Sequence, residues 1–94
     1  MLNNGGIMRH IEYTPELVCS KLIAFDLDEE NKIHNLQFVG GCHGNLKAIG
    51  LLCENKDAKE IAELLSGNTC RMLPTSCADQ LAKALLKSLS EYAN

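Results

Sequence analysis

The chain has 94 residues, 46% of them hydrophobic, which is enough for one compact domain. Its net charge of -3 gives it no basic surface for nucleic-acid phosphates. No apolar run approaches the roughly 20 residues that span a bilayer, and MLNNGGIMRH lacks the features of a signal peptide. We therefore expect a cytoplasmic protein that binds neither nucleic acid nor membrane, with a disordered tip over residues 1–7 and a single domain over residues 8–94.

The first half of the chain predicts three strands. RHIEY, residues 9–13, alternates and is rich in residues that favour strands. In VCSKLIAFDLDEENKIHNLQFVGG, two further such arms flank the polar residues 28–31, which suit a hairpin turn. The three strands are expected to form an antiparallel meander.

Alternation predicts which strand residues share a face. In the second strand one face carries Ile23, Phe25 and Leu27. In the third strand, Leu36 and Phe38 fall on one face and Ile33 and Val39 fall on the other. We therefore expect part of the sheet to be covered on both sides.

The second half predicts three helices. Apolar residues recur at spacings of three and four from Leu46, and this first helix runs to Asn55. Asp57 begins the second helix, with Glu60 completing a capping box and Gly67 providing a left-handed stop. One face of the terminal helix is lined by Ala78, Leu81, Ala82, Leu85, Leu89 and Tyr92. The fold class is thus α+β, with three helices packed on one face of an antiparallel sheet.

The chain has five cysteines, and in a reducing compartment their number suggests metal binding, redox chemistry or burial. Cys53 lies on the apolar stripe of the first helix and is interpreted as a small buried hydrophobic residue. The other four lie near the ends of predicted elements.

Cys77 lies at the start of the terminal helix, where exposed N–H groups and the helix dipole favour a negatively charged thiolate. Ser76 is expected to cap this helix, with Asp79 as the acidic member of a capping box. Cys42 lies in the glycine-rich turn GGCHGN before another helix, and Cys19 reaches the same end of the meander. These positions suit a shared metal ion, although their irregular spacing differs from the paired Cys-x-x-Cys spacing of typical zinc sites.

The histidines offer no comparable signal. His43, beside Cys42, is either a ligand or a polar surface residue, and the second interpretation is favoured. His10 and His34 lie among polar neighbours in strands and are assigned no role.

Three segments carry a resemblance to a known family: YTPELVCSKLI, FVGGCHGNLKAIGLL and NTCRMLPTSCADQLAKAL. Together they resemble the TSCPD-domain family, in particular its small stand-alone members. The motif that names the family is present as residues 75–79, with Ala78 in place of proline. The resemblance implies kinship with the C-terminal domain of B12-dependent ribonucleotide reductases, but 94 residues cannot supply the barrel that such an enzyme needs. We therefore expect no enzymatic activity.

The chain is also similar, more distantly, to the U-type (IscU, SufU and NifU N-terminal) iron–sulfur scaffolds, which implies a SufE/NifU-like fold. This resemblance implies that Cys19, Cys42 and Cys77 hold zinc or a nascent cluster. Lys21 stands where those scaffolds carry aspartate, so the usual fourth ligand is missing. Cys70 can replace it, and four thiolates would form a closed zinc site with Zn–S distances of about 2.3 Å.

The sequence therefore favours a noncatalytic zinc-binding module that is accessory to ribonucleotide reductase or to sulfur and iron–sulfur trafficking. The alternative is a thiol-based sulfur or redox carrier, or an iron–sulfur cluster scaffold, with Lys21 holding a reactive thiolate charged without metal. A partner protein from one of those systems is expected on family grounds. A homodimer through Leu51 and the terminal helix is a further possibility.

Overall fold

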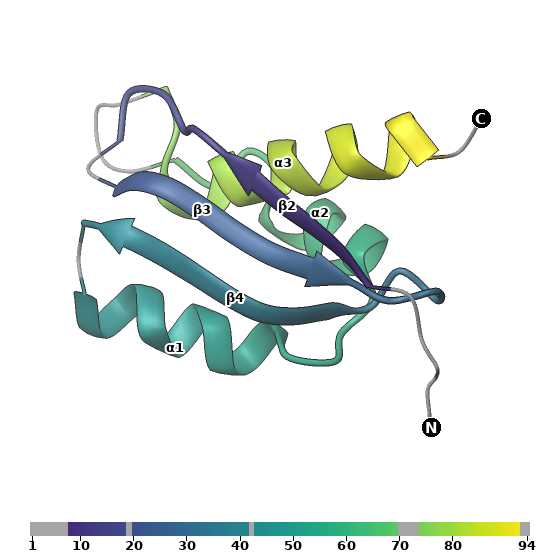
Figure 1. Ribbon diagram of the computed structural model, residues 1–94. Helices are drawn as coiled ribbons and strands as arrows, with labels where there is room; N and C mark the ends of the chain where they lie inside the picture. Colours follow the sequence, from purple (N-terminus) through teal and green to yellow (C-terminus); the bar gives the residue numbers. More distant parts are fainter. Residues whose placement is uncertain (1–7, 19, 42, 70–73, 93–94) are drawn as a thin grey trace.

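The computed structural model describes residues 8–18, 20–41, 43–69 and 74–92, without the side chains of His43 and Tyr92. It confirms the α+β prediction: an antiparallel sheet in the order β2-β3-β4 is followed by three helices (Figure 1). The elements are β2 (Arg9–Tyr13), β3 (Ser20–Leu27), β4 (Ile33–Gly40), α1 (His43–Cys53), α2 (Ala58–Leu65) and α3 (Cys77–Tyr92). The predicted tip, residues 1–7, lies outside the described residues.

The predicted hairpin turn joins β3 to β4. The carboxylate of Asp28 accepts hydrogen bonds from the backbone N–H groups of Glu30 at 2.8 Å and Lys32 at 3.0 Å. Asn31 adopts a φ of 61°, which asparagine tolerates better than most residues. An aspartate that binds its own turn and an asparagine in the left-handed region explain why the chain reverses here.

Strand β4 contains a bulge that simple alternation does not predict. Its pairing with β3 passes from Ala24↔Gln37 to Asp26↔His34, so β4 carries one additional residue. Within that stretch Asn35 has a φ of 56°. The additional residue brings Ile33 and Leu36 into the same core, so the prediction that they occupy opposite faces was wrong. Val39 is 51% exposed to solvent, so the prediction that this part of the sheet is covered on both sides was also wrong.

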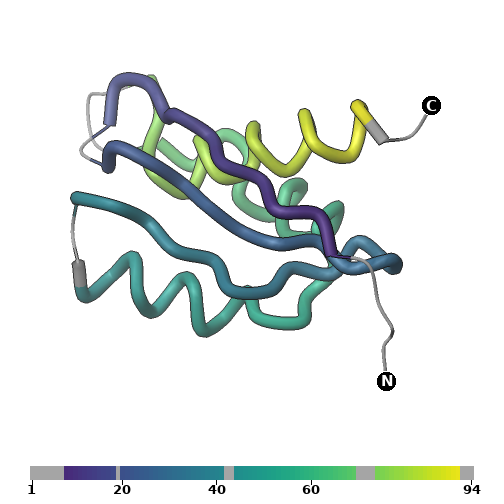
Figure 2. Tube along the Cα trace, in the orientation of Figure 1, coloured from purple at the N-terminus to yellow at the C-terminus, as the bar shows by residue number. Residues whose placement is uncertain are grey.

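The hydrophobic core lies between the sheet and the helices. Helices α2 and α3 pack against each other behind the sheet, whereas α1 lies alongside β4 (Figures 1 and 2). Cys53 is buried in this core as predicted, and burial raises the pKa of its thiol. The core residues are Ile23, Phe25, Leu27, Ile33, Leu36, Cys53, Ala58, Ala62, Leu81, Ala82, Ala84 and Leu85.

The predicted N-cap and left-handed stop of α2 are both present. The Asp57 side chain accepts a hydrogen bond from the Glu60 N–H at 3.0 Å, and Gly67 follows the helix with a φ of 84°. Within the described residues, no helix combines the length and apolar character needed to cross a bilayer.

Helix α1 approaches β4 closely because it presents a glycine to the strand. A Cβ atom built on Gly50 would lie 2.9 Å from the carbonyl oxygen of Leu36, whereas one built on Gly44 would contact nothing within 4 Å. Gly50 is therefore required by packing, and Gly44 is not.

Candidate functional site

Of the four predicted metal ligands, the structure describes one. Cys77 is the first residue of α3, and its side chain is half-buried. Cys19, Cys42 and Cys70 lie outside the described residues. Among the residues that the structure does describe, no three His, Cys, Asp or Glu side chains are grouped so that they could hold a metal ion.

The helix that carries Cys77 is capped as the sequence predicts. The Ser76 hydroxyl accepts a hydrogen bond from the Asp79 N–H at 3.1 Å. The same hydroxyl donates to the backbone carbonyl oxygen of Asn68. One small side chain therefore begins α3 and also ties it to the segment that follows α2.

Asp79 has a different role from the one predicted. Its carboxylate accepts hydrogen bonds from the Gly67 N–H at 2.7 Å and from the Thr75 hydroxyl, and does not complete a capping box with Ser76. The Thr75 hydroxyl, the Gly67 N–H and nearby Lys83 lower the pKa of this buried carboxyl. The Asp79 carboxylate thus connects α3 to the segment that follows α2.

Gln80 connects the same motif to the segment before β3. Its side-chain amide donates to the Thr75 hydroxyl at 3.0 Å and accepts from the Glu16 N–H at 3.0 Å. Both Thr75 and Gln80 are buried, so these bonds satisfy polar groups that water does not reach. The segment before β3 is thereby held against the start of α3.

Ser20, the first residue of β3, connects the sheet to Cys77. Its hydroxyl lies 3.2 Å from the Cys77 sulfur, and Ser20 itself is only 3% exposed. Ser20 also pairs with Gly40, the last residue of β4. The start of β3, the end of β4 and the start of α3 accordingly gather at one end of the molecule (Figure 2).

Sequence reasoning placed Cys77 and Ser76 at the start of α3 but missed the contacts of Ser20, Thr75 and Gln80. A capping pattern is local, so it can be recognised in a string of residues. The missed contacts join residues far apart in the chain. One feature of the sequence could have indicated them. Thr75, Asp79 and Gln80 are polar residues next to the apolar stripe of α3 that continues with Leu81.

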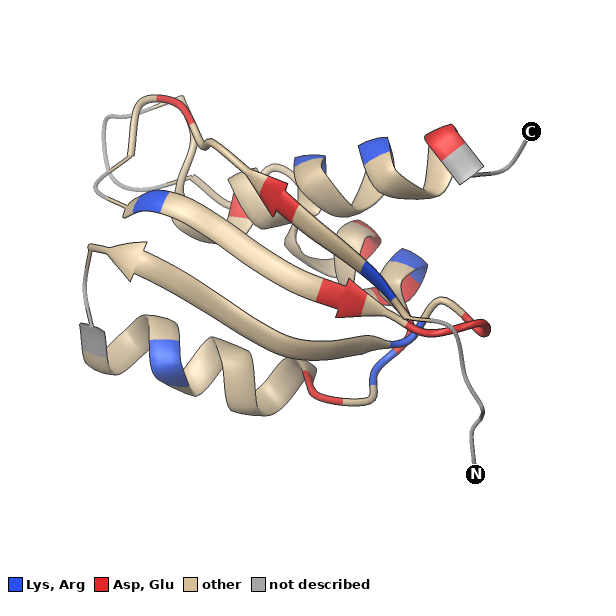
Figure 3. Cartoon of the chain, in the orientation of Figure 1, with Lys and Arg blue, Asp and Glu red and all other residues tan. Residues whose placement is uncertain are grey.

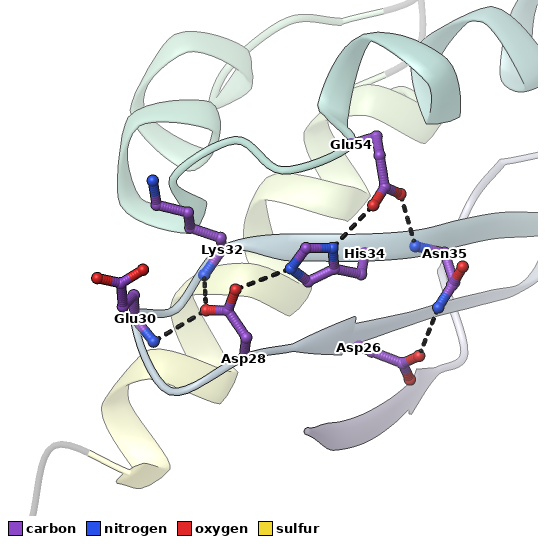
Figure 4. A network of polar contacts seen from close by, with 7 residues as sticks. All are labelled: Asp26, Asp28, Glu30, Lys32, His34, Asn35 and Glu54. Carbon is purple, nitrogen blue, oxygen red and sulfur yellow. Dashed lines mark hydrogen bonds and ion pairs between the residues drawn. The ribbon is translucent and has the colours of Figure 1, made fainter. Parts of the chain in front are cut away.

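A second polar cluster, which was not predicted, lies at the opposite end of β3 (Figure 4). The two ring nitrogens of His34 lie 2.8 Å from Asp28 Oδ2 and 2.7 Å from Glu54 Oε2. The hydrogen bond to Asp28, followed by the bond to Glu54, raises the pKa of His34. Glu54 also accepts from the Asn35 N–H at 2.9 Å, so it joins the end of α1 to the bulge of β4.

His10 has a similar but more exposed setting. It lies 2.7 Å from Asp26 and 3.1 Å from Glu12, and the bond to Asp26 is the larger cause that raises its pKa. Asp26 in turn accepts from the Asn35 side chain at 3.0 Å. Acidic residues therefore concentrate around the strand ends and the β3–β4 turn (Figure 3). His34, to which we assigned no role, joins the β3–β4 turn to the end of α1, whereas His10 stays largely exposed.

Comparison with known proteins identifies the family. The model of the TSCPD domain matches residues 5–89. No curated protein and no solved structure matches the chain. The match includes the strands, the first two helices, the motif around Cys77 and α3 as far as Leu89, and the chain therefore belongs to the TSCPD-domain family.

Proposed function

We propose that this protein is a noncatalytic metal-binding module in which Cys19, Cys42, Cys70 and Cys77 bind zinc. The proposal rests on one observation: the contacts around Cys77 join segments that stand next to the other three cysteines in the sequence.

Three connections make up this observation, and the second runs through the first. Ser20, whose hydroxyl lies 3.2 Å from the Cys77 sulfur, directly follows Cys19. Gly40 pairs with Ser20 and precedes Cys42 by two residues. Asn68 accepts the hydrogen bond of Ser76. It precedes Cys70 by two residues.

The chemistry of this donor set favours zinc. Thiolates are soft ligands, and four of them are typical of a tetrahedral structural zinc site. Cys77 is the first residue of α3, and helix N-termini favour negatively charged groups. A hydroxyl beside the Cys77 sulfur would serve as an outer hydrogen-bond partner. Such a site would stabilise the domain or a docked partner, and a protein of ribonucleotide reduction or of sulfur trafficking is the partner that we propose.

Elemental analysis of the chain purified without chelator tests this function. We expect about one zinc per chain and four thiols that react only after a strong chelator is added. Cys77→Ser should lose the metal. The matched control, Cys53→Ala, changes a buried cysteine of the core and should retain it. Metal-free protein with freely reacting thiols would disprove the module.

A second candidate is a thiol-based sulfur or redox carrier, or a scaffold for an iron–sulfur cluster. The Ser20 hydroxyl favours it, because a hydroxyl 3.2 Å from the Cys77 sulfur can donate a hydrogen bond to a reactive thiolate that holds no metal. The resemblance to U-type scaffolds stays a prediction from the sequence. Rapid alkylation of Cys77 in metal-free buffer would support the carrier, and a visible absorption band after anaerobic reconstitution with iron and sulfide would support the scaffold.

A further inference from the structure

Helix α1 exposes two large apolar side chains. Leu51 and Leu52 are each 72% exposed, although Leu46 and Cys53 on the other side of the same helix are buried. Figure 3 shows little charge along α1 compared with α3. A helix that is apolar on both sides commonly packs against something on both sides.

A groove lies beside Leu51. It has a volume of about 500 Å³ and runs between β4 and α1. Leu36, Phe38 and Leu46 supply its apolar lining, and Leu51 lies on its helical wall. The groove and the exposed side chain of Leu51 form one continuous surface, called here the α1 surface.

The two charged residues of this groove differ in their partners. Lys47 makes no ion pair or side-chain hydrogen bond with any other described residue. Glu54 and Asp28 share the single positive charge that His34 carries when protonated, which leaves one negative charge in excess. The oxygens of Glu54 have further lone pairs free to accept another donor.

The spacing of these charges favours a second copy of the same chain. Lys47, Leu51 and Glu54 are separated by four and three positions, so they lie along one face of the helix and its end. Lys47 and Glu54 stand about 10 Å apart along the axis. If two such helices pair antiparallel about a twofold axis near Leu51, each Lys47 lies opposite the partner's Glu54.

We propose that the protein forms a twofold-symmetric dimer through the α1 surface, with Leu51 of each chain packed over the groove of the other. An isologous contact of this kind needs a self-complementary patch, and the order cation, leucine, anion along α1 provides one. Apolar packing would supply most of the affinity, and the two charge pairs would fix the antiparallel orientation. This proposal is independent of metal binding.

Sedimentation of the full chain over a concentration series tests the dimer, in reducing buffer with and without chelator so that metal-bridged species are recognised. Wild type should show a monomer–dimer equilibrium. Leu51→Asp should raise the dissociation constant by at least roughly tenfold. The matched control is Leu64→Asp on α2, at a residue that is 76% exposed, and it should change nothing.

A charge variant tests the orientation. Lys47→Glu should weaken the dimer by placing like charges together, whereas Lys47→Arg should preserve it and Lys87→Glu on α3 should have no effect. A chain that stays monomeric at all concentrations would overturn the proposal and reassign the α1 surface to a different protein. A dimer that Leu51→Asp leaves intact, or that Lys47→Glu strengthens, would overturn it as well.

Discussion

At the scale of single residues, Asp79 shows how one buried carboxylate serves several segments. It binds the Gly67 N–H and the Thr75 hydroxyl, and its own N–H is bound by Ser76. Because these donors stabilise the charged form, they lower the pKa of Asp79 in the folded state. Its contribution to stability is therefore present above the pKa of the unfolded chain and is lost as the pH falls through the lower, folded value.

We predict that Asp79→Asn destabilises the domain by about 1–3 kcal/mol, because an amide cannot accept both bonds and leaves a buried donor poorly satisfied. The variant should also lose less stability than wild type between about pH 5 and pH 3. Urea denaturation at these pH values measures both effects. Glu91→Gln, an exposed change on the same helix, is the control and should behave like wild type.

At the scale of elements, the contact between α1 and β4 depends on one missing Cβ atom. We predict that Gly50→Ala destabilises the fold by about 1–3 kcal/mol, because the backbone oxygen of Leu36 at 2.9 Å cannot move away as a flexible side chain would. Gly44→Ala on the same helix should be neutral or stabilising by up to about 1 kcal/mol. Thermal unfolding compares the pair, and equal losses in both variants would contradict the packing explanation.

Hydrogen bonds among His34, Asp28 and Glu54 connect three parts of the fold: the β3–β4 turn, the bulge of β4 and the end of α1. The pKa of His34 is raised in the folded state. The contribution of His34 to stability is therefore complete below the unfolded pKa near 6.5 and is lost as the pH rises through the folded pKa. We predict that His34→Gln costs about 1–3 kcal/mol at about pH 6 and much less at about pH 9.

Chemical denaturation of wild type and His34→Gln at both pH values measures this difference. His10→Gln is the matched control, since its ring is 60% exposed and solvent screens its ion pairs. It should change the stability less at either pH. A His34→Gln variant that keeps the full alkaline loss of stability would show that another group causes it.

At the scale of the whole molecule, the proposed zinc site would link segments that are distant in the chain. A metal held only by the folded state stabilises it by mass action. We therefore predict that a strong chelator lowers the Tm of wild type by roughly 10 °C or more. In Cys77→Ser the chelator should have no effect on Tm, whereas in Cys53→Ala it should still lower it. A chelator-insensitive wild type would count against the metal but would leave the TSCPD fold and the α1 dimer untouched.

Local signals in the sequence predict most of the fold, because they act within one or two turns. The terminal helix, the caps at Asp57 and Ser76 and the hairpin at residues 28–31 all belong to this class. The bulge at Asn35 shows the limit. One additional residue in β4 places Ile33 on the opposite face from the predicted one. The residues next to it carry no pattern that predicts the bulge.

The sequence by itself determined the element types, their order, the family and the place of Cys77 at a capped helix start, because periodicity, capping and motif are properties of neighbouring residues. Only the tertiary structure decided that Ser20 touches Cys77, that Asp79 binds the end of α2 and that His34 stands between two carboxylates. Each of these contacts joins residues that the chain separates. The energy that selects them comes from burying the whole core at once, which no local stretch encodes.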